Sequence, residues 1–106
     1  MRKTIRFQVM MAAVVLLAGA VGFAQSGEAT YKAKCQGCHG AAGVPSPAMA
    51  KAMGVKPATD PSVKSSTETK MIAVTTNGAG KMPAFKGKLT DAQIKDSVDY
   101  FRTFAK

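Results

Sequence analysis

The stretch KCQGCHG, residues 34–40, holds both cysteines and the only histidine of the 106-residue chain. Its spacing places two thiols three residues apart, with the imidazole directly after the second thiol. On a helical turn, side chains three positions apart lie on one face, and the next residue projects beside them. The stretch therefore predicts a site that holds one bound group through sulfur and nitrogen together.

The Cys-x-x-Cys-His pattern is the signature for covalent haem attachment. In this interpretation Cys35 and Cys38 form thioethers with one haem edge, and His39 binds the iron at one axial position. We weighed three alternatives. A thioredoxin-type redox pair normally accompanies a parallel sheet, for which the chain has no strand pattern. A zinc site needs about four ligands, and the chain has no further cysteine or histidine to complete the set. An inert disulfide leaves His39 without a role. We predict one covalent haem c, with its iron, as the cofactor.

Residues 1–24 have the composition of a secretory signal. Three basic and no acidic residues precede sixteen uncharged ones, and Gly22 and Ala24 are the small residues that a signal peptidase needs. The alternative is an uncleaved anchor, but a spanning helix needs about 20 residues. We expect cleavage after Ala24 and export to the periplasm, with a thylakoid lumen as the alternative. The mature haem domain is then residues 25–106, without a membrane span.

The charge balance is basic. The formal net charge is +9, and loss of the signal leaves 12 basic against 6 acidic residues. No basic patch interleaved with aromatic side chains indicates nucleic-acid binding. A mature chain this small rarely stabilises itself by burial alone, and it has few aromatic side chains. We therefore expect a bound group to complete the core.

Caps and apolar spacing predict an all-α domain of about four short helices joined by long loops. The clearest helix follows Thr90, which can form a capping box with Gln93. Its apolar side chains form one stripe: Ile94, Val98, Phe101 and Ala105. Other helices are expected from Ser26 to near residue 37, in a short piece before residue 54, and from Ser66 or Thr67 to residue 77. The stretch 55–63 reads as loop because it carries two prolines.

The second axial ligand is expected to be a methionine, because the chain has no second histidine; lysine and water are weaker options. Met71 lies in an expected amphipathic helix, and Met49 and Met53 have the i, i+4 spacing of core packing. Met82 stands in the glycine-rich loop GAGKMPAF, where the following proline stiffens the backbone. We predict His39 and Met82 as the axial iron ligands, and a cavity enclosed between them.

The pattern "GEATYKAKCQGCHG … SPAM … TNGAGKMPAF … QIKDSVDYFRTF" resembles the small soluble class I monohaem cytochromes c of bacterial and photosynthetic-lumen type. The resemblance covers essentially the whole mature chain, although residues 54–65 are not diagnostic. It implies a cytochrome c-like fold wrapped around one haem, with the N-terminal helix packed across the C-terminal one. Gly27, Tyr31 and Tyr100 match that contact.

The resemblance also implies a hydrogen bond from Nδ1 of His39 to a proline carbonyl. Pro47 is the better match for this acceptor, and Pro45 is the alternative. Such a bond would fix the orientation of the imidazole ring and raise its basicity.

With both axial positions filled, no substrate reaches the iron, so we expect a soluble, monomeric electron carrier rather than an enzyme. The lysines that flank the two ligand motifs predict a positive rim that attracts redox partners with acidic docking surfaces: Lys34, Lys81, Lys86 and Lys88. Three alternatives stay open. They are a haem enzyme with an open sixth position, a thiol–disulfide oxidoreductase that uses both cysteines, and a haem c subunit of a larger oxidoreductase.

Overall fold

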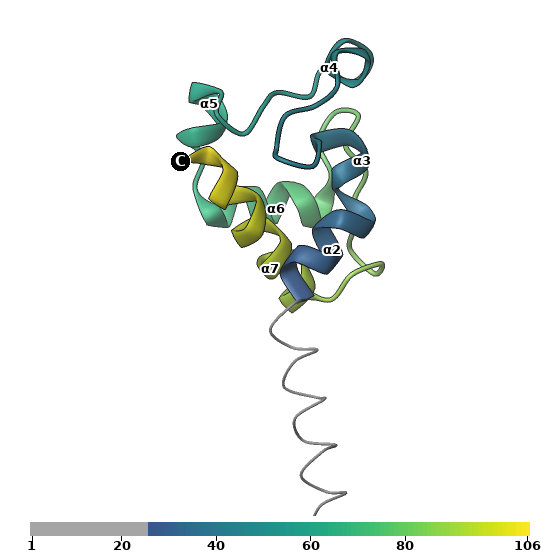
Figure 1. The fold of residues 1–106 in the computed structure, drawn as a ribbon. Coiled ribbons are helices and arrows are strands. Elements are labelled where there is room, and N and C mark those ends of the chain that lie inside the picture. Colours follow the sequence, from purple (N-terminus) through teal and green to yellow (C-terminus); the bar gives the residue numbers. More distant parts are fainter. Residues whose placement is uncertain (1–25) are drawn as a thin grey trace, which may run out of the picture.

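The computed structural model describes residues 26–106, so the expected secretory signal lies outside the described residues. Six α-helices and one 3-10 turn make up this part, without an extended strand (Figure 1). The elements are α2 (Ser26–Lys34), α3 (Gln36–His39), α4 (Pro47–Met53), α5 (Pro61–Lys64), α6 (Glu68–Asn77), α7 (Asp91–Arg102) and η1 (Thr103–Ala105). None of the helices in residues 26–106 has the length and apolar character that crossing a bilayer requires.

The pair α2 and α7 is the most extensive helix contact of the fold (Figure 1). Gly27 allows the two backbones to approach, since a Cβ atom there would lie 2.7 Å from the carbonyl oxygen of Asp96. Tyr31 is 1% exposed. Its ring centroid lies 5.3 Å from that of Tyr100 and 5.6 Å from that of Phe104. The contact implied by Gly27, Tyr31 and Tyr100 is therefore present.

Helices α6 and α7 begin where the sequence predicts them. Thr90 and Gln93 make both bonds of the capping box: Thr90 Oγ1 accepts from the Gln93 backbone at 3.1 Å, and Gln93 Oε1 accepts from the Thr90 backbone at 2.9 Å. Thr67, rather than Ser66, caps α6 by accepting from the Lys70 backbone. These caps satisfy backbone donors that have no partner within the helix, so each fixes a helix start.

Two predictions about helices need correction. The expected continuous helix up to residue 37 is divided, because α2 ends at Lys34 and α3 begins at Gln36. The stretch predicted as loop contains α5. Asp60 caps α5 by accepting from the Ser62 backbone at 2.9 Å, and Pro61 stands at its first position, where a helix tolerates proline.

The fully buried apolar core is small. Among residues 26–106 it consists of Tyr31, Ala58, Ile94 and Val98. Tyr31 lies on α2 and Ile94 and Val98 lie on α7, whereas Ala58 lies in the loop before α5, beside Gly43. The polar side chains of Thr30, Thr75 and Ser97 are also buried. The interior between α3, α6 and α7 is a cavity instead of packed side chains.

Candidate functional site

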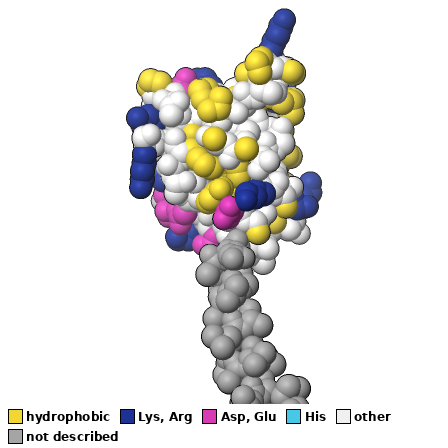
Figure 2. Space-filling model, viewed as in Figure 1, with side chains coloured by type: hydrophobic (Ala, Val, Ile, Leu, Met, Phe, Trp, Pro, Cys, Tyr) yellow, Lys and Arg dark blue, Asp and Glu magenta, His cyan; other side chains and the backbone are white. Residues whose placement is uncertain are grey.

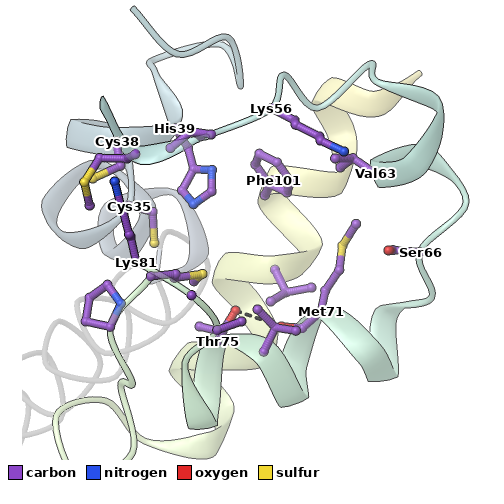
Figure 3. A pocket seen from close by; sticks show the side chains of 18 of the residues that line it. Cys35, Cys38, His39, Lys56, Val63, Ser66, Met71, Thr75, Lys81 and Phe101 are labelled. Atoms are coloured by element: carbon purple, nitrogen blue, oxygen red, sulfur yellow. Dashed lines mark hydrogen bonds between the residues drawn. The ribbon is translucent and has the colours of Figure 1, made fainter. Parts of the chain in front are cut away.

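A cavity of about 730 Å³ lies between α3, α6, α7 and the loops that join the other helices (Figure 3). This volume is within the range of roughly 300–1,000 Å³ that cofactor sites occupy. Side chains from most of the described chain line it, including Cys35, Cys38, His39, Met53, Val63, Met71, Val74, Met82, Phe85, Val98 and Phe101. The expected cavity between His39 and Met82 is therefore present.

Cys35, Cys38 and His39 reach the cavity from one backbone turn. The Cys35 N–H donates to Tyr31 O at 2.9 Å as the last bond of α2, and Cys35 O accepts from the His39 N–H at 3.0 Å. Figure 3 shows both sulfurs and the imidazole grouped on one side of the cavity. Neither cysteine is in a disulfide. Burial raises the pKa of the Cys35 thiol, and the neighbouring Cys38 raises it further.

His39 points its ring into the cavity (Figure 3). The ring lies 5.3 Å from that of Phe101, at an interplanar angle of 62°. Burial lowers the pKa of His39, which favours the neutral imidazole, the form that binds metals. Its Nδ1 is the only buried side-chain nitrogen or oxygen within residues 26–106 that has no hydrogen-bond partner. Such an atom is costly unless a bound group or a rearrangement compensates for it.

Met82 lines the same cavity from the loop between α6 and α7. The backbones of Ala79 and Met82 exchange two hydrogen bonds, of 3.1 and 2.9 Å, which make a tight turn. Gly78 begins this turn at φ +78°, and a Cβ atom there would lie 2.9 Å from Met82 O. The Phe85 N–H donates to Thr75 O at 3.0 Å and fastens the loop to the end of α6.

Two other candidate methionines, Met53 and Met71, also line the cavity, whereas Met49 does not. The sulfur of Met71 lies 3.8 Å from an Arg102 guanidinium nitrogen, which donates a hydrogen bond to it. That contact occupies a lone pair of the Met71 sulfur. The structure therefore brings His39 and Met82 to one cavity, with Met53 and Met71 also in its lining and Met49 outside it.

Pro47 lies outside the cavity. It is exposed at the first position of α4, while Pro45 is buried. Because Nδ1 of His39 has no partner among the described residues, it bonds to neither proline. The carbonyl next to the histidine, Gly40 O, accepts instead from the Tyr31 hydroxyl at 2.6 Å. A hydrogen bond from His39 to a proline carbonyl is therefore absent from the described residues, and the role of Pro47 stays a prediction for the haem-bound protein.

Charge around the cavity is of one sign. Its lining contains lysines and no acidic residue: Lys34, Lys56, Lys70 and Lys81. The ion pairs within residues 26–106 use Lys32 and Lys95 instead. Figure 2 shows acidic side chains mainly in the lower part of one face. Sequence reasoning missed Lys56 and Lys70, since neither is close in sequence to a ligand motif.

The residues present fit a covalently attached haem. Two thiols lie at one side of a mostly apolar cavity, and the His39 imidazole, whose pKa burial lowers, lies beside them. A methionine sulfur enters from a loop 43 residues farther along the chain. This donor set of two thiols, an imidazole and a thioether is the set that c-type haem uses.

Comparisons with known proteins agree with this reading of the site. A family model described as "Cytochrome C oxidase, cbb3-type, subunit III" matches residues 22–101. The fold is similar to the solved structure of the KustC0563 c-type cytochrome, with a TM-score of 0.68 and 28% sequence identity. That similarity covers 76% of this chain and 98% of the other. No curated protein matches the chain.

Proposed function

The chain belongs to the c-type cytochrome family described as cytochrome c oxidase, cbb3-type, subunit III, and from this premise we propose that one haem c is held by Cys35, Cys38, His39 and Met82. The two cysteines would form the thioethers, and His39 and Met82 would be the axial ligands of the iron. The observation that carries the proposal is that all four side chains line one cavity.

Family membership confirms three predictions: a small monohaem cytochrome c, a helical cytochrome c-like fold, and haem c with iron as the cofactor. Haem-based electron transfer follows from it. The haem supplies a one-electron couple when bound. Cys35, Cys38, His39 and Met82 would hold it, apolar side chains such as Val74 and Phe101 would surround it, and the lysines of the lining would add positive charge.

The finer role that we propose is a soluble carrier in the periplasm that is not itself an enzyme. Two axial protein ligands leave no position on the iron for a substrate. Cavity lysines without ion pairs among the described residues support docking to partners with acidic surfaces. Electrostatic attraction of this kind raises association rates more than affinity, which suits a protein that must leave its partner after one electron.

A second candidate is a haem c subunit of a larger oxidoreductase. The description of the matching family favours it, because that description names an oxidase subunit. The two candidates differ in the state of the native protein. A carrier elutes as a single small protein after gentle extraction of the source cells, whereas a subunit elutes with membrane-complex proteins.

Visible spectroscopy of the exported protein tests the site. We expect a pyridine haemochrome of c type, a sharp reduced band, and a weak red band of the oxidised form that reports the methionine–iron bond. Met82→Ala should remove the red band and keep the covalent haem, while Met71→Ala should keep both. A colourless protein with two titratable thiols would overturn the proposal and favour a dithiol function for Cys35 and Cys38.

A further inference from the structure

Helix α4 has few ties to the rest of the protein. Its cap bonds are local: Ser46 Oγ accepts from Met49 N at its start, and Gly54 N donates to Ala50 O at its end. Figure 1 shows α4 standing apart from the group formed by α2, α6 and α7. Within residues 26–106, the one hydrogen bond that joins α4 to a distant segment runs from Lys81 Nζ to Ala52 O, at 2.7 Å.

The chemistry of this contact suits both partners. Ala52 is in the last turn of α4, where the backbone carbonyls have no N–H donor within the helix. These carbonyls also form the negative end of the helix dipole, which attracts a cation. The Lys81 ammonium therefore satisfies an unpaired acceptor and complements the charge of the helix end. The two residues are 29 positions apart, so the bond closes a large loop of chain.

The position of this contact connects it to the site. Lys81 directly precedes Met82, and Met53 directly follows Ala52; Lys81, Met82 and Met53 all line the cavity. Backbone hydrogen bonds already fasten the Met82 loop to the end of α6 through Thr75. The Lys81 bond fastens the same loop on its other side, to α4.

We propose that Lys81 is a positioning residue for Met82: its bond to Ala52 O holds the Met82 loop and α4 together and so disfavours the conformations in which the Met82 sulfur has left the iron. This inference rests on the proposed function, because it concerns Met82 as an axial ligand. A loop fastened on both sides has fewer open conformations than one fastened on α6 alone, so an external ligand competes less well for the iron.

Imidazole titration of the oxidised holoprotein tests the inference, because imidazole binds the iron only after the Met82 sulfur has left. The variants are Lys81→Ala, Lys81→Arg and the matched control Lys51→Ala. Lys51 is an exposed lysine of α4 that does not line the cavity, and its side chain has no hydrogen bond or ion pair to the described chain. Its removal changes the net charge by the same amount.

We expect Lys81→Ala to bind imidazole about 3- to 10-fold more tightly than the parent, the range for loss of one modest hydrogen bond. Lys81→Arg should stay within about twofold of the parent, because the guanidinium keeps the charge and the donors. Lys51→Ala should match the parent. The red band should be lost at a lower temperature in Lys81→Ala alone.

Equal affinities in Lys81→Ala and Lys51→Ala would overturn the inference, and so would an arginine variant that binds as tightly as the alanine variant. A parent protein with covalent haem but no red band would instead overturn Met82 ligation itself. The failure of the positioning role and the failure of the proposed function therefore give different results.

Discussion

At the scale of single residues, Tyr31 joins the helix core to the haem motif. Its ring packs against Tyr100 and Phe104, and its hydroxyl donates to Gly40 O at 2.6 Å, directly after His39. The buried hydroxyl therefore fixes the end of the turn that carries His39. Burial raises the pKa of Tyr31 from 10.0 to about 12, and nearby Cys35 contributes to the rise.

This raised pKa predicts a loss of stability at alkaline pH. A group whose pKa is higher in the folded state stabilises the fold fully below its unfolded pKa and loses that contribution as pH rises through the folded value. The free energy of unfolding should therefore fall by about 2 kcal/mol between pH 10 and 12. Denaturant titrations across this pH range measure the fall.

Tyr31→Phe separates this contribution from other titrations. The variant should be about 1 kcal/mol less stable at pH 7, because Gly40 O loses its donor, and its stability should fall less above pH 10. Tyr100→Phe is the control, since the Tyr100 hydroxyl donates no hydrogen bond among the described residues. A Tyr31→Phe protein that follows the pH dependence of the parent would contradict the assignment.

At the scale of elements, the contact of α2 with α7 depends on one missing side chain. A Cβ atom at Gly27 would lie 2.7 Å from a backbone oxygen of Asp96, and a backbone atom cannot move aside as a flexible side chain does. The two helices must therefore separate to admit any larger residue. Separation would also disturb the ring contacts of Tyr31 on the same helix face.

Gly27→Ala should destabilise the holoprotein by about 1–3 kcal/mol, the usual cost of an overpacked contact. Gly37→Ala is the matched control in α3, because a Cβ atom there meets nothing within 4 Å. An alanine in a helix is favoured over glycine by up to about 1 kcal/mol, so the control should be neutral or slightly stabilised. Thermal unfolding of both variants gives the answer, and equal melting temperatures would mean that the helices adjust freely.

The same scale shows what sequence reasoning can reach. Helix α7 and the turn of Cys35, Cys38 and His39 are specified by local signals, namely a capping box and a five-residue motif. The division between α2 and α3 falls at Cys35, whose backbone has φ −115° and ψ −37°, and no proline or cap signal in the sequence marks it. Helix α5 was missed because two prolines outweighed the cap that Asp60 provides.

Long-range contacts could not be predicted from the sequence either. The bond between Lys81 and Ala52 O joins segments 29 residues apart, and no periodicity or spacing encodes it. Lys56 and Lys70 reach the cavity only because the fold brings the loop before α5 and helix α6 around it. The sequence therefore predicts the donors that would bind the cofactor, while the structure adds the residues around them.

At the scale of the whole molecule, charge is unevenly distributed. Lysines without acidic partners line the cavity, while Glu28, Glu68 and Asp99 form ion pairs on helices α2, α6 and α7. Apolar side chains occupy the centre of the face in Figure 2, with basic side chains near its edges. The molecule therefore presents a positive field around the region that we propose holds the haem.

This distribution predicts a salt dependence of electron transfer that depends on the charge of the partner. Reduction of hexacyanoferrate(III), an anion, should slow as ionic strength rises from 10 to 150 mM, because the screening length falls from about 30 to about 8 Å. A cationic cobalt complex should react faster over the same range. Stopped-flow measurements with both oxidants provide the comparison. Rate constants that do not change with ionic strength would rule out electrostatic attraction at this surface.

The small buried core has a consequence for the folding of the chain before its cofactor is attached. Four fully buried apolar side chains over residues 26–106 are too few to hold a domain together by themselves. We therefore expect a newly made chain to stay unfolded until its cofactor is attached. An unfolded chain is also open to proteolysis, so we expect the protein without its cofactor to be cleaved faster than the loaded protein.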